Sequence, residues 1–230
     1  MKASKRIGIL GGISLESTVR YYDSLLKKYY KRRKDYHYPE IVIFSLDFQR
    51  FSDFEEKGRR EHYIQYIMQG IESLENGGVD FIVMAANSPH SEFGEIQRRA
   101  RVPLLNIAEV TAAKAHGMGI TKALLLGIKH TIRSSSYKEA YIRNGIEVIV
   151  PSDTEQDEIE KIIFNELVLG IKRESSRQRM VSIIDGYPAD AVILGCTELP
   201  LLLAQEDVAQ RLLDTAALHI EAALDYALEG

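Results

Sequence analysis

The sequence predicts an α/β protein made of two pseudo-symmetric doubly wound domains, each with a parallel sheet, with a ligand cleft between them. Short apolar runs alternate along the chain with longer segments of helical periodicity, as in successive βαβ units. The apolar runs are nearly continuous, which is typical of parallel strands that are buried on both faces. An internal repeat, described below, indicates two halves of similar construction.

Each predicted strand is a run of five or six mainly apolar residues, and each predicted helix repeats its apolar residues every three or four positions. The predicted strands are 6–11, 40–45, 81–86, 104–108, 123–128, 147–151 and 191–196. The predicted helices are 16–32, 56–76, 91–100, 109–116, 134–144, 155–184 and 209–228. We therefore expect an N-terminal domain of residues 1–108, completed by 209–230, and a second domain of residues 109–208.

The two halves repeat each other. The segment "KRIGILGG" at 5–12 corresponds to "TKALLLGI" at 121–128, and "GGVDFIVMAANSPH" at 77–90 corresponds to "YPADAVILGCTELP" at 187–200. This alignment places Ala86 and Cys196 at the same structural position. Open α/β sheets bind ligands at the carboxyl ends of their strands, so the polar tetrads "NSPH" and "TELP" are the predicted walls of the cleft.

Composition indicates a soluble chain: 230 residues, 45% hydrophobic and 27% charged, with a net charge of -4. This charge gives no broad basic field for nucleic acid, and no apolar stretch is long enough to cross a membrane. The N-terminus has no secretory apolar region, so we expect a cytoplasmic protein. The chain has one cysteine and no Cys/His spacing that would hold zinc, so we expect no metal.

Five motifs together resemble the aspartate/glutamate racemase family over essentially the whole chain: "IGILGGISLESTVRYY" at 7–22, "MAANSPH" at 84–90, "IIFNELVLG" at 162–170, "ILGCTELPLLL" at 193–203 and "DTAALHIEAAL" at 214–224. The opening is most similar to a bacterial branch that includes enzymes specific for L-aspartate and L-glutamate. The resemblance implies an amino-acid racemase that needs no pyridoxal phosphate or other cofactor. Its substrate would be a small acidic amino acid, with a dicarboxylate as an alternative ligand. We also expect a homodimer.

In that family, the resemblance implies two thiols on opposite sides of the α-carbon, because inversion needs a base on one face and an acid on the other. Cys196 matches the second thiol, and Ala86 stands where the first is expected. An alanine methyl neither accepts nor donates a proton. The related L-specific branch commonly has a threonine at this position. The sequence is the same whether Ala86 is natural or replaces an original cysteine.

The resemblance also implies substrate-binding residues. Asn87 and Ser88 match the family's carboxylate-binding pair, and Thr197 has the corresponding role in the second half. Glu198 is expected either to influence the thiol or to cap a helix. The remaining candidates are Gly12 and Ser14 at the end of the first strand, and Thr131 in a loop.

We expect Cys196 to be reactive, with its thiol pKa lowered by the start of a helix after the strand. His90 and His219 are expected to make structural hydrogen bonds. Two other functions stay open. One is a one-thiol decarboxylase or isomerase of the same superfamily, and the other is a catalytically inactive protein that binds dicarboxylates or amino acids.

Overall fold

The computed structural model describes residues 4–229, which form two units, each an α/β fold with a parallel sheet. The first unit ends at Asn106 and resumes at His219, and the second comprises Ile107–Leu218. The fold class predicted from the sequence, α/β with parallel sheets in two halves, is confirmed. Residues 1–3 and 230 of the predicted first domain lie outside the described residues.

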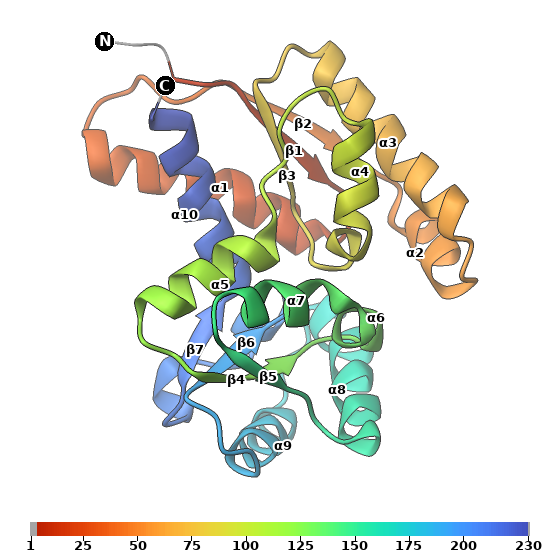
Figure 1. The fold of residues 1–230 in the computed structure, drawn as a ribbon, viewed down its shortest axis with the longest axis vertical. Helices are drawn as coiled ribbons and strands as arrows, with labels where there is room; N and C mark the ends of the chain where they lie inside the picture. Colours follow the sequence, from red (N-terminus) through yellow and green to blue (C-terminus); the bar gives the residue numbers. More distant parts are fainter. Residues whose placement is uncertain (1–3, 230) are drawn as a thin grey trace. The chain divides into compact units, whose positions relative to one another are not determined.

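The first unit has the strand order β2-β1-β3, and all its strands are parallel. In Figure 1, α1 and α10 lie on one side of this sheet, and α3 and α4 lie on the other. Its elements are β1 (Ile7–Gly11), α1 (Leu15–Arg33), β2 (Ile41–Ser45), α2 (Phe48–Glu56), α3 (Arg60–Asn76), β3 (Phe81–Met84), the 3-10 helix η1 (Ser88–Glu92), α4 (Phe93–Arg99) and the portion from His219 of α10 (Thr215–Leu228).

Alternation along the strands divides the core of this unit into two layers. Leu10, Ile82 and Met84 pack with the apolar face of α3. On the other face, Phe81 meets the ring of Tyr226 of α10 edge-on, with 4.8 Å between ring centroids. Both faces of the sheet are therefore covered, which accounts for the continuous apolar runs in β1 and β3.

The second unit has four parallel strands in the order β5-β4-β6-β7. Its elements are α5 (Ile107–Gly117), β4 (Lys122–Leu126), α6 (Lys129–Arg133), α7 (Ser135–Arg143), β5 (Glu147–Ile149), α8 (Asp153–Asn165), the 3-10 helix η2 (Leu167–Leu169), α9 (Glu174–Asp185), β6 (Ala191–Leu194), the 3-10 helices η3 (Leu199–Leu201) and η4 (Gln205–Asp207), β7 (Arg211–Asp214) and the start of α10.

The helices of this unit also cover both faces of its sheet. Leu126 and Leu194 pack with α8 and α9, whereas Leu125 and Ile193 pack with α5 and α7. A layer of helices on each face is the doubly wound arrangement expected from the sequence.

Two errors of the sequence prediction concern strands. Residues 104–108 do not form a strand, because Leu104 makes only an isolated bridge to Ile82 and α5 already begins at Ile107. The predicted helix at 209–228 begins six residues late, because Arg211–Asp214 forms β7 beside β6. Four residues are too few for a periodic signal, and the edge position of β7 depends on pairing with a distant strand. Residues 209–218 consequently belong to the second unit.

The predicted helix at 155–184 is two helices. The segment between α8 and α9 contains Gly170, which has a positive φ of 72° and ends η2 in a left-handed conformation. The predicted helix at 56–76 likewise starts only at Arg60, after Gly58 with a φ of 60°. The predicted helix at 134–144 is α7, which α6 precedes. In the predicted helices 155–184 and 56–76, a glycine with a positive φ stands where the helix is interrupted.

Candidate active site

The carboxyl ends of β3 and β6 have the same backbone arrangement in their separate units. The residue before Ala86 donates its amide to the carbonyl of Leu10 (2.8 Å), and the residue before Cys196 donates its amide to the carbonyl of Leu126 (2.7 Å). Leu10 and Leu126 occupy corresponding positions in β1 and β4. Ala86 and Cys196 therefore occupy equivalent positions after equivalent strands, as the sequence repeat predicts.

In the first unit, the turn after β1 has an unusual backbone. Gly12 has a φ of 81°, and a Cβ there would lie 2.1 Å from the carbonyl oxygen of Leu46, so only glycine fits. Ser14 has a φ of 103°, which L-residues rarely adopt, and its Oγ caps α1 by accepting from the amide of Ser17 (3.2 Å). Strained backbone of this kind is concentrated at functional sites. Ser14 is thus a structural cap as well as a candidate ligand-binding residue.

Three side chains at the end of β3 are almost fully buried. Ala86, Asn87 and Ser88 are 5%, 6% and 7% exposed. Asn87 precedes η1, but its side chain makes no capping hydrogen bond. Ser88 hydrogen-bonds to Tyr63, whose hydroxyl also donates to Glu55 Oε1 (3.2 Å). The Asn87 side chain therefore does not act as a helix cap, and Ser88 has a hydrogen-bond partner within its own unit.

In the second unit, a carboxylate lies directly against the thiol. Sγ of Cys196 donates to Glu198 Oε2 at 2.9 Å, and the hydroxyl of Thr197 donates to the same oxygen at 2.9 Å. Glu198 is only 4% exposed, and its other oxygen, Oε1, is buried without a hydrogen-bond partner in the described part of the chain. Cys196 itself keeps some exposed surface. Glu198 was expected either to influence the thiol or to cap a helix, and its hydrogen bond to Sγ corresponds to the first of these roles.

The expected lowering of the thiol pKa is wrong. Burial of the sulfur and the neighbouring Glu198 carboxylate raise the pKa of Cys196 well above its usual value of 9.0. The segment after the strand explains the difference: η3 is a three-residue 3-10 helix, too short to provide a substantial helix dipole. The resting thiol is therefore protonated at neutral pH.

Thr131 lies in α6, not in a loop as expected, and is 2% exposed. Its Cγ2 would lie 3.5 Å from a Cβ placed on Gly195, so it packs beside the backbone that leads to Cys196. Its hydroxyl is buried without a hydrogen-bond partner in the described residues. A buried hydroxyl without a partner calls for an explanation, and a polar ligand beside Gly195 would supply one.

Sequence reasoning missed Tyr137 of α7. Burial raises the pKa of its phenol, which also hydrogen-bonds to Thr215 and lies near enough to Cys196 to interact with it electrostatically. Tyr137 lies within the predicted helix at 134–144. No sequence signal indicated that it lies near the thiol, because the two residues are 59 positions apart and tertiary packing brings them together.

The two histidines have structural contacts, as expected. Nε2 of His219 lies 3.0 Å from the carbonyl of Leu105, so it must carry the proton, and Nδ1 then accepts from the hydroxyl of Tyr21 (2.9 Å). Burial lowers the pKa of His219 to about 4. Burial and the nearby His219 lower the pKa of His90 well below 6.5. Both rings are neutral at physiological pH.

A cavity of about 720 Å³ in the first unit lies elsewhere. It is lined by residues at the amino ends of the strands, among them Arg6, Glu40 and Asp80. Arg6 pairs with Glu40, and its backbone amide donates to Asp80 (2.6 Å). The cavity lies at the end of the sheet opposite to Ala86, so it is not the candidate active site.

Within residues 4–229, no group of three or more His, Cys, Asp and Glu side chains is arranged to hold a metal ion. No helix in the same range is long and apolar enough to cross a membrane.

Comparisons with known proteins identify the family of this chain. The family described as Asp/Glu/Hydantoin racemase matches residues 10–223. The broad specificity amino-acid racemase RacX of Bacillus subtilis is 31% identical over 206 residues, which cover 86% of this chain and 87% of RacX. A crystal structure of a candidate Asp/Glu racemase from Yersinia pestis is 34% identical, with a TM-score of 0.90, and the match covers 97% of this chain and 99% of that one. An aspartate racemase homologue from Pyrococcus horikoshii is 35% identical, with the same coverages and a TM-score of 0.83.

The fold and the family match together define an α/β protein of the racemase class. The chain belongs to the Asp/Glu/Hydantoin racemase family, and the resemblance found in the sequence is confirmed. The family relationship supports an amino-acid racemase.

Proposed function

We propose that this chain is a cofactor-independent racemase of a small acidic amino acid, aspartate or glutamate, and that Cys196 transfers the α-proton. The observation that carries the proposal is the hydrogen bond between Cys196 Sγ and the buried carboxylate of Glu198 at 2.9 Å. Relatives named as aspartate and glutamate racemases support the substrate class. RacX, a broad specificity racemase, makes a wider substrate range the main alternative.

The thiol and the carboxylate share one proton. For Cys196 to act as a base, its proton moves to Glu198 Oε2, and the thiolate then accepts the α-proton of the substrate. The reverse sequence returns a proton to carbon and restores the resting pair. The pair carries one negative charge with either placement of its shared proton, so no isolated thiolate has to exist beside a charged carboxylate. The raised pKa of Cys196 fits this resting state.

The methyl group of Ala86 supplies no second acid or base. We propose that Cys196 exchanges the α-proton of one enantiomer with solvent faster than the centre is inverted, because inversion needs a proton from another donor, such as water. A rise in racemisation on restoring a thiol at position 86 is the expected consequence.

We propose substrate-binding roles for the polar residues at the strand ends. Asn87, Ser88 and Thr197 would hold the α-carboxylate, since amide and hydroxyl groups at strand ends can bind an anion. The other candidates are Gly12 and Ser14 in the turn after β1, Thr131 beside Gly195, and Glu198 as the proton acceptor. The buried, unpartnered hydroxyl of Thr131 supports its inclusion.

The test is proton NMR of the protein in heavy water with each enantiomer of aspartate and glutamate, and with alanine as a non-acidic amino acid. We expect loss of the α-proton signal with one enantiomer of an acidic amino acid, and slower appearance of the opposite enantiomer by chiral chromatography. Cys196→Ser gives the background rate. Ala86→Cys should raise inversion relative to exchange. An Ala86→Cys protein that folds and binds aspartate, yet leaves both rates at background, would contradict the proposal.

The single thiol also favours a second candidate, a decarboxylase or isomerase that protonates a planar intermediate from one face. Such an enzyme would consume a dicarboxylate and incorporate deuterium with one stereochemistry, without racemising an amino acid. A protein that binds aspartate in calorimetry, but neither exchanges nor inverts it, would be the inactive binder. We further propose a homodimer in the cytoplasm, which cell fractionation and the oligomer measurements below test.

A further inference from the structure

Helix α1 has an exposed apolar row along one face. Leu15, Val19, Tyr22, Leu26 and Tyr30 are spaced by four, three, four and four residues. At 3.6 residues per turn, this spacing places the five side chains within an arc of about 80°. Leu15, Val19, Tyr22 and Tyr30 are 74%, 56%, 45% and 44% exposed, and Leu26 between them is partly buried. We call these five residues the α1 row.

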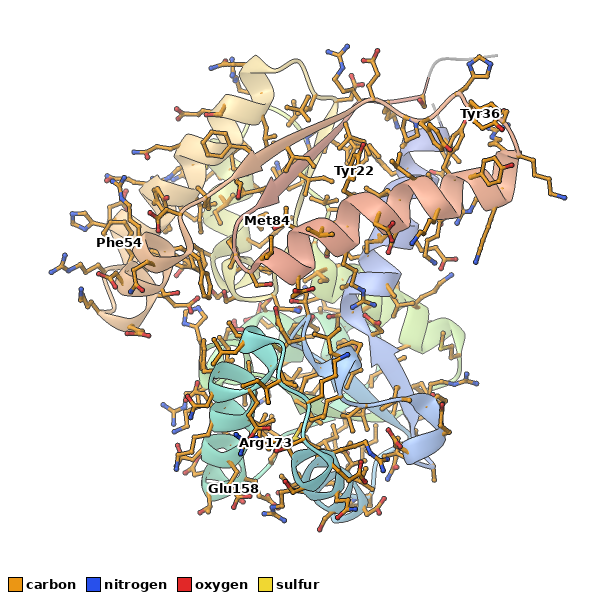
Figure 2. The ribbon with its side chains drawn as sticks, turned by 180° about the vertical axis from the view of Figure 1, so that it is seen from behind. Tyr22, Tyr36, Phe54, Met84, Glu158 and Arg173 are labelled. Atoms are coloured by element: carbon orange, nitrogen blue, oxygen red, sulfur yellow. The ribbon has the colours of Figure 1, made fainter. Side chains whose placement is uncertain are left out.

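A different face of α1 supplies its contacts with the rest of the first unit. Tyr21, Leu25 and Tyr29 are buried, so the core of the unit does not need the α1 row. The loop after the helix adds Tyr36, which is 80% exposed. Figure 2 shows α1 along its length, with Tyr22 labelled on the helix and Tyr36 on the loop beyond it. Single exposed apolar residues are ordinary, but a contiguous row of this kind marks an interaction surface.

Charges beside the row indicate what it binds. Glu16 lies at the start of α1, and Lys31 and Lys34 lie at its end and just beyond it. None of these three makes an ion pair within the described residues, in contrast to Lys28, which pairs with Glu221 of α10. By helical geometry, Glu16 flanks the row, Lys31 lies further round the helix on the same side, and Arg33 lies in line with the row at its basic end. The surface is therefore acidic at one end and basic at the other.

This polarity makes the surface complementary to itself. Suppose that two copies of α1 pack with their rows in contact and run antiparallel, related by a two-fold axis that passes near Tyr22 and is perpendicular to both helices. The flank that carries Glu16 in one copy then lies beside the same flank of the other copy. Glu16 of each copy then lies toward the basic end of the other, and the helix dipoles also oppose each other favourably. Parallel packing would instead place like charges at the same level. The same pairing brings Leu15 toward the partner's Tyr30.

We propose that α1 is the surface through which two copies of this chain associate, antiparallel about a two-fold axis near Tyr22. The contact is isologous, so the same residues contribute from both copies and the assembly closes as a dimer. This inference does not depend on the proposed catalytic activity.

The first test is the molar mass of the full chain by sedimentation equilibrium. We expect a dimer for the unsubstituted protein and a monomer for Val19→Glu, which places two carboxylates in the contact. Ile142→Glu on α7 is the matched control, because Ile142 is 57% exposed and Val19 is 56% exposed. The control should remain a dimer. Circular dichroism with thermal unfolding checks that both variants fold.

A cross-linking test is simple because the chain has a single native cysteine, which one substitution removes. In a Cys196→Ser background, Tyr22→Cys lies next to its symmetry mate and should form a disulfide-linked dimer under mild oxidation. Leu15→Cys should not, because seven residues from the axis separate the two sulfurs by about 21 Å along the helices, whereas a disulfide needs Cα atoms within about 7 Å. A monomeric unsubstituted protein, a dimeric Val19→Glu protein, or equal cross-linking of the two cysteine variants would each overturn the proposal.

Discussion

Removal of the negative charge of Glu198 should make the Cys196 thiol more acidic. Glu198 Oε2 accepts the thiol proton at 2.9 Å, and both this hydrogen bond and the charge of the carboxylate raise the thiol pKa. Glu198→Gln keeps the length of the side chain, and its amide can hydrogen-bond to either the thiol or the thiolate. The substitution therefore changes the charge with little change in shape.

The size of the effect follows from the distance. Two unit charges 2.9 Å apart repel by about 1.4 kcal/mol in water and by about 6 kcal/mol at an effective dielectric constant of about 20. These energies correspond to pKa changes of about 1 and about 4 units. Burial of the sulfur, the largest cause of the raised pKa, is unchanged by the substitution. We expect a fall of at least about 1 unit from the value in the unsubstituted protein.

The assay is the rate of iodoacetamide alkylation as a function of pH, followed by intact mass. Cys196 is the only cysteine in the chain, so the added mass reports on this thiol alone. Alkylation of the unsubstituted protein should be slow at neutral pH and should accelerate as pH rises, and aspartate should slow it. Glu206→Gln, an exposed residue of the same unit, is the control and should not shift the profile. An unchanged or higher midpoint for Glu198→Gln would refute the assigned contact.

Three further predictions concern the first unit. Ser14→Gly should raise the free energy of unfolding by about 1 kcal/mol, because it relieves the φ of 103°. Ser14→Ala should lower the free energy of unfolding by about 1 kcal/mol, because it removes the helix cap. Urea unfolding of both variants measures the two signs, and a stabilising Ser14→Ala would contradict this account. The pKa of His219 is lowered to about 4 from a usual 6.5, so its neutral ring contributes stability that is present above pH 6.5 and lost as pH falls through about 4. The expected loss in the free energy of unfolding is roughly 3 kcal/mol. This loss should be smaller in His219→Gln and unchanged in the exposed control His37→Gln, as measured by urea unfolding at each pH. Asn87→Ala should weaken aspartate binding by about 1 to 3 kcal/mol in calorimetry, and an unchanged affinity would argue against a carboxylate-binding role.

The sequence predicted the buried framework of the fold well. The runs that became β1, β3, β4 and β6 are continuously apolar because both faces of these strands are covered, and this burial is recorded in the residues themselves. The short edge strand β7 was missed, because four residues show no period and their pairing with β6 is non-local. The false strand at 104–108 has the same origin: its apolar residues are buried, but only Leu104 pairs with another strand segment.

The sequence by itself also determined the family and the position of the candidate catalytic thiol. The repeat aligned Ala86 with Cys196, and the backbone hydrogen bonds after β3 and β6 have the same arrangement. These features are local patterns of residue type and spacing, so they can be recognised without coordinates.

Only the tertiary structure decided the chemical state of the thiol. The motif around Cys196 suggested a helix that would acidify it, but the chain forms a three-residue 3-10 helix, buries the sulfur and turns Glu198 toward it. Packing also brings Tyr137 near the same sulfur. A pKa depends on desolvation and on the distances to charges, and both are set by segments that fold together from separate parts of the chain. The sequence therefore identified Cys196, and the folded environment determined that its thiol is protonated at rest.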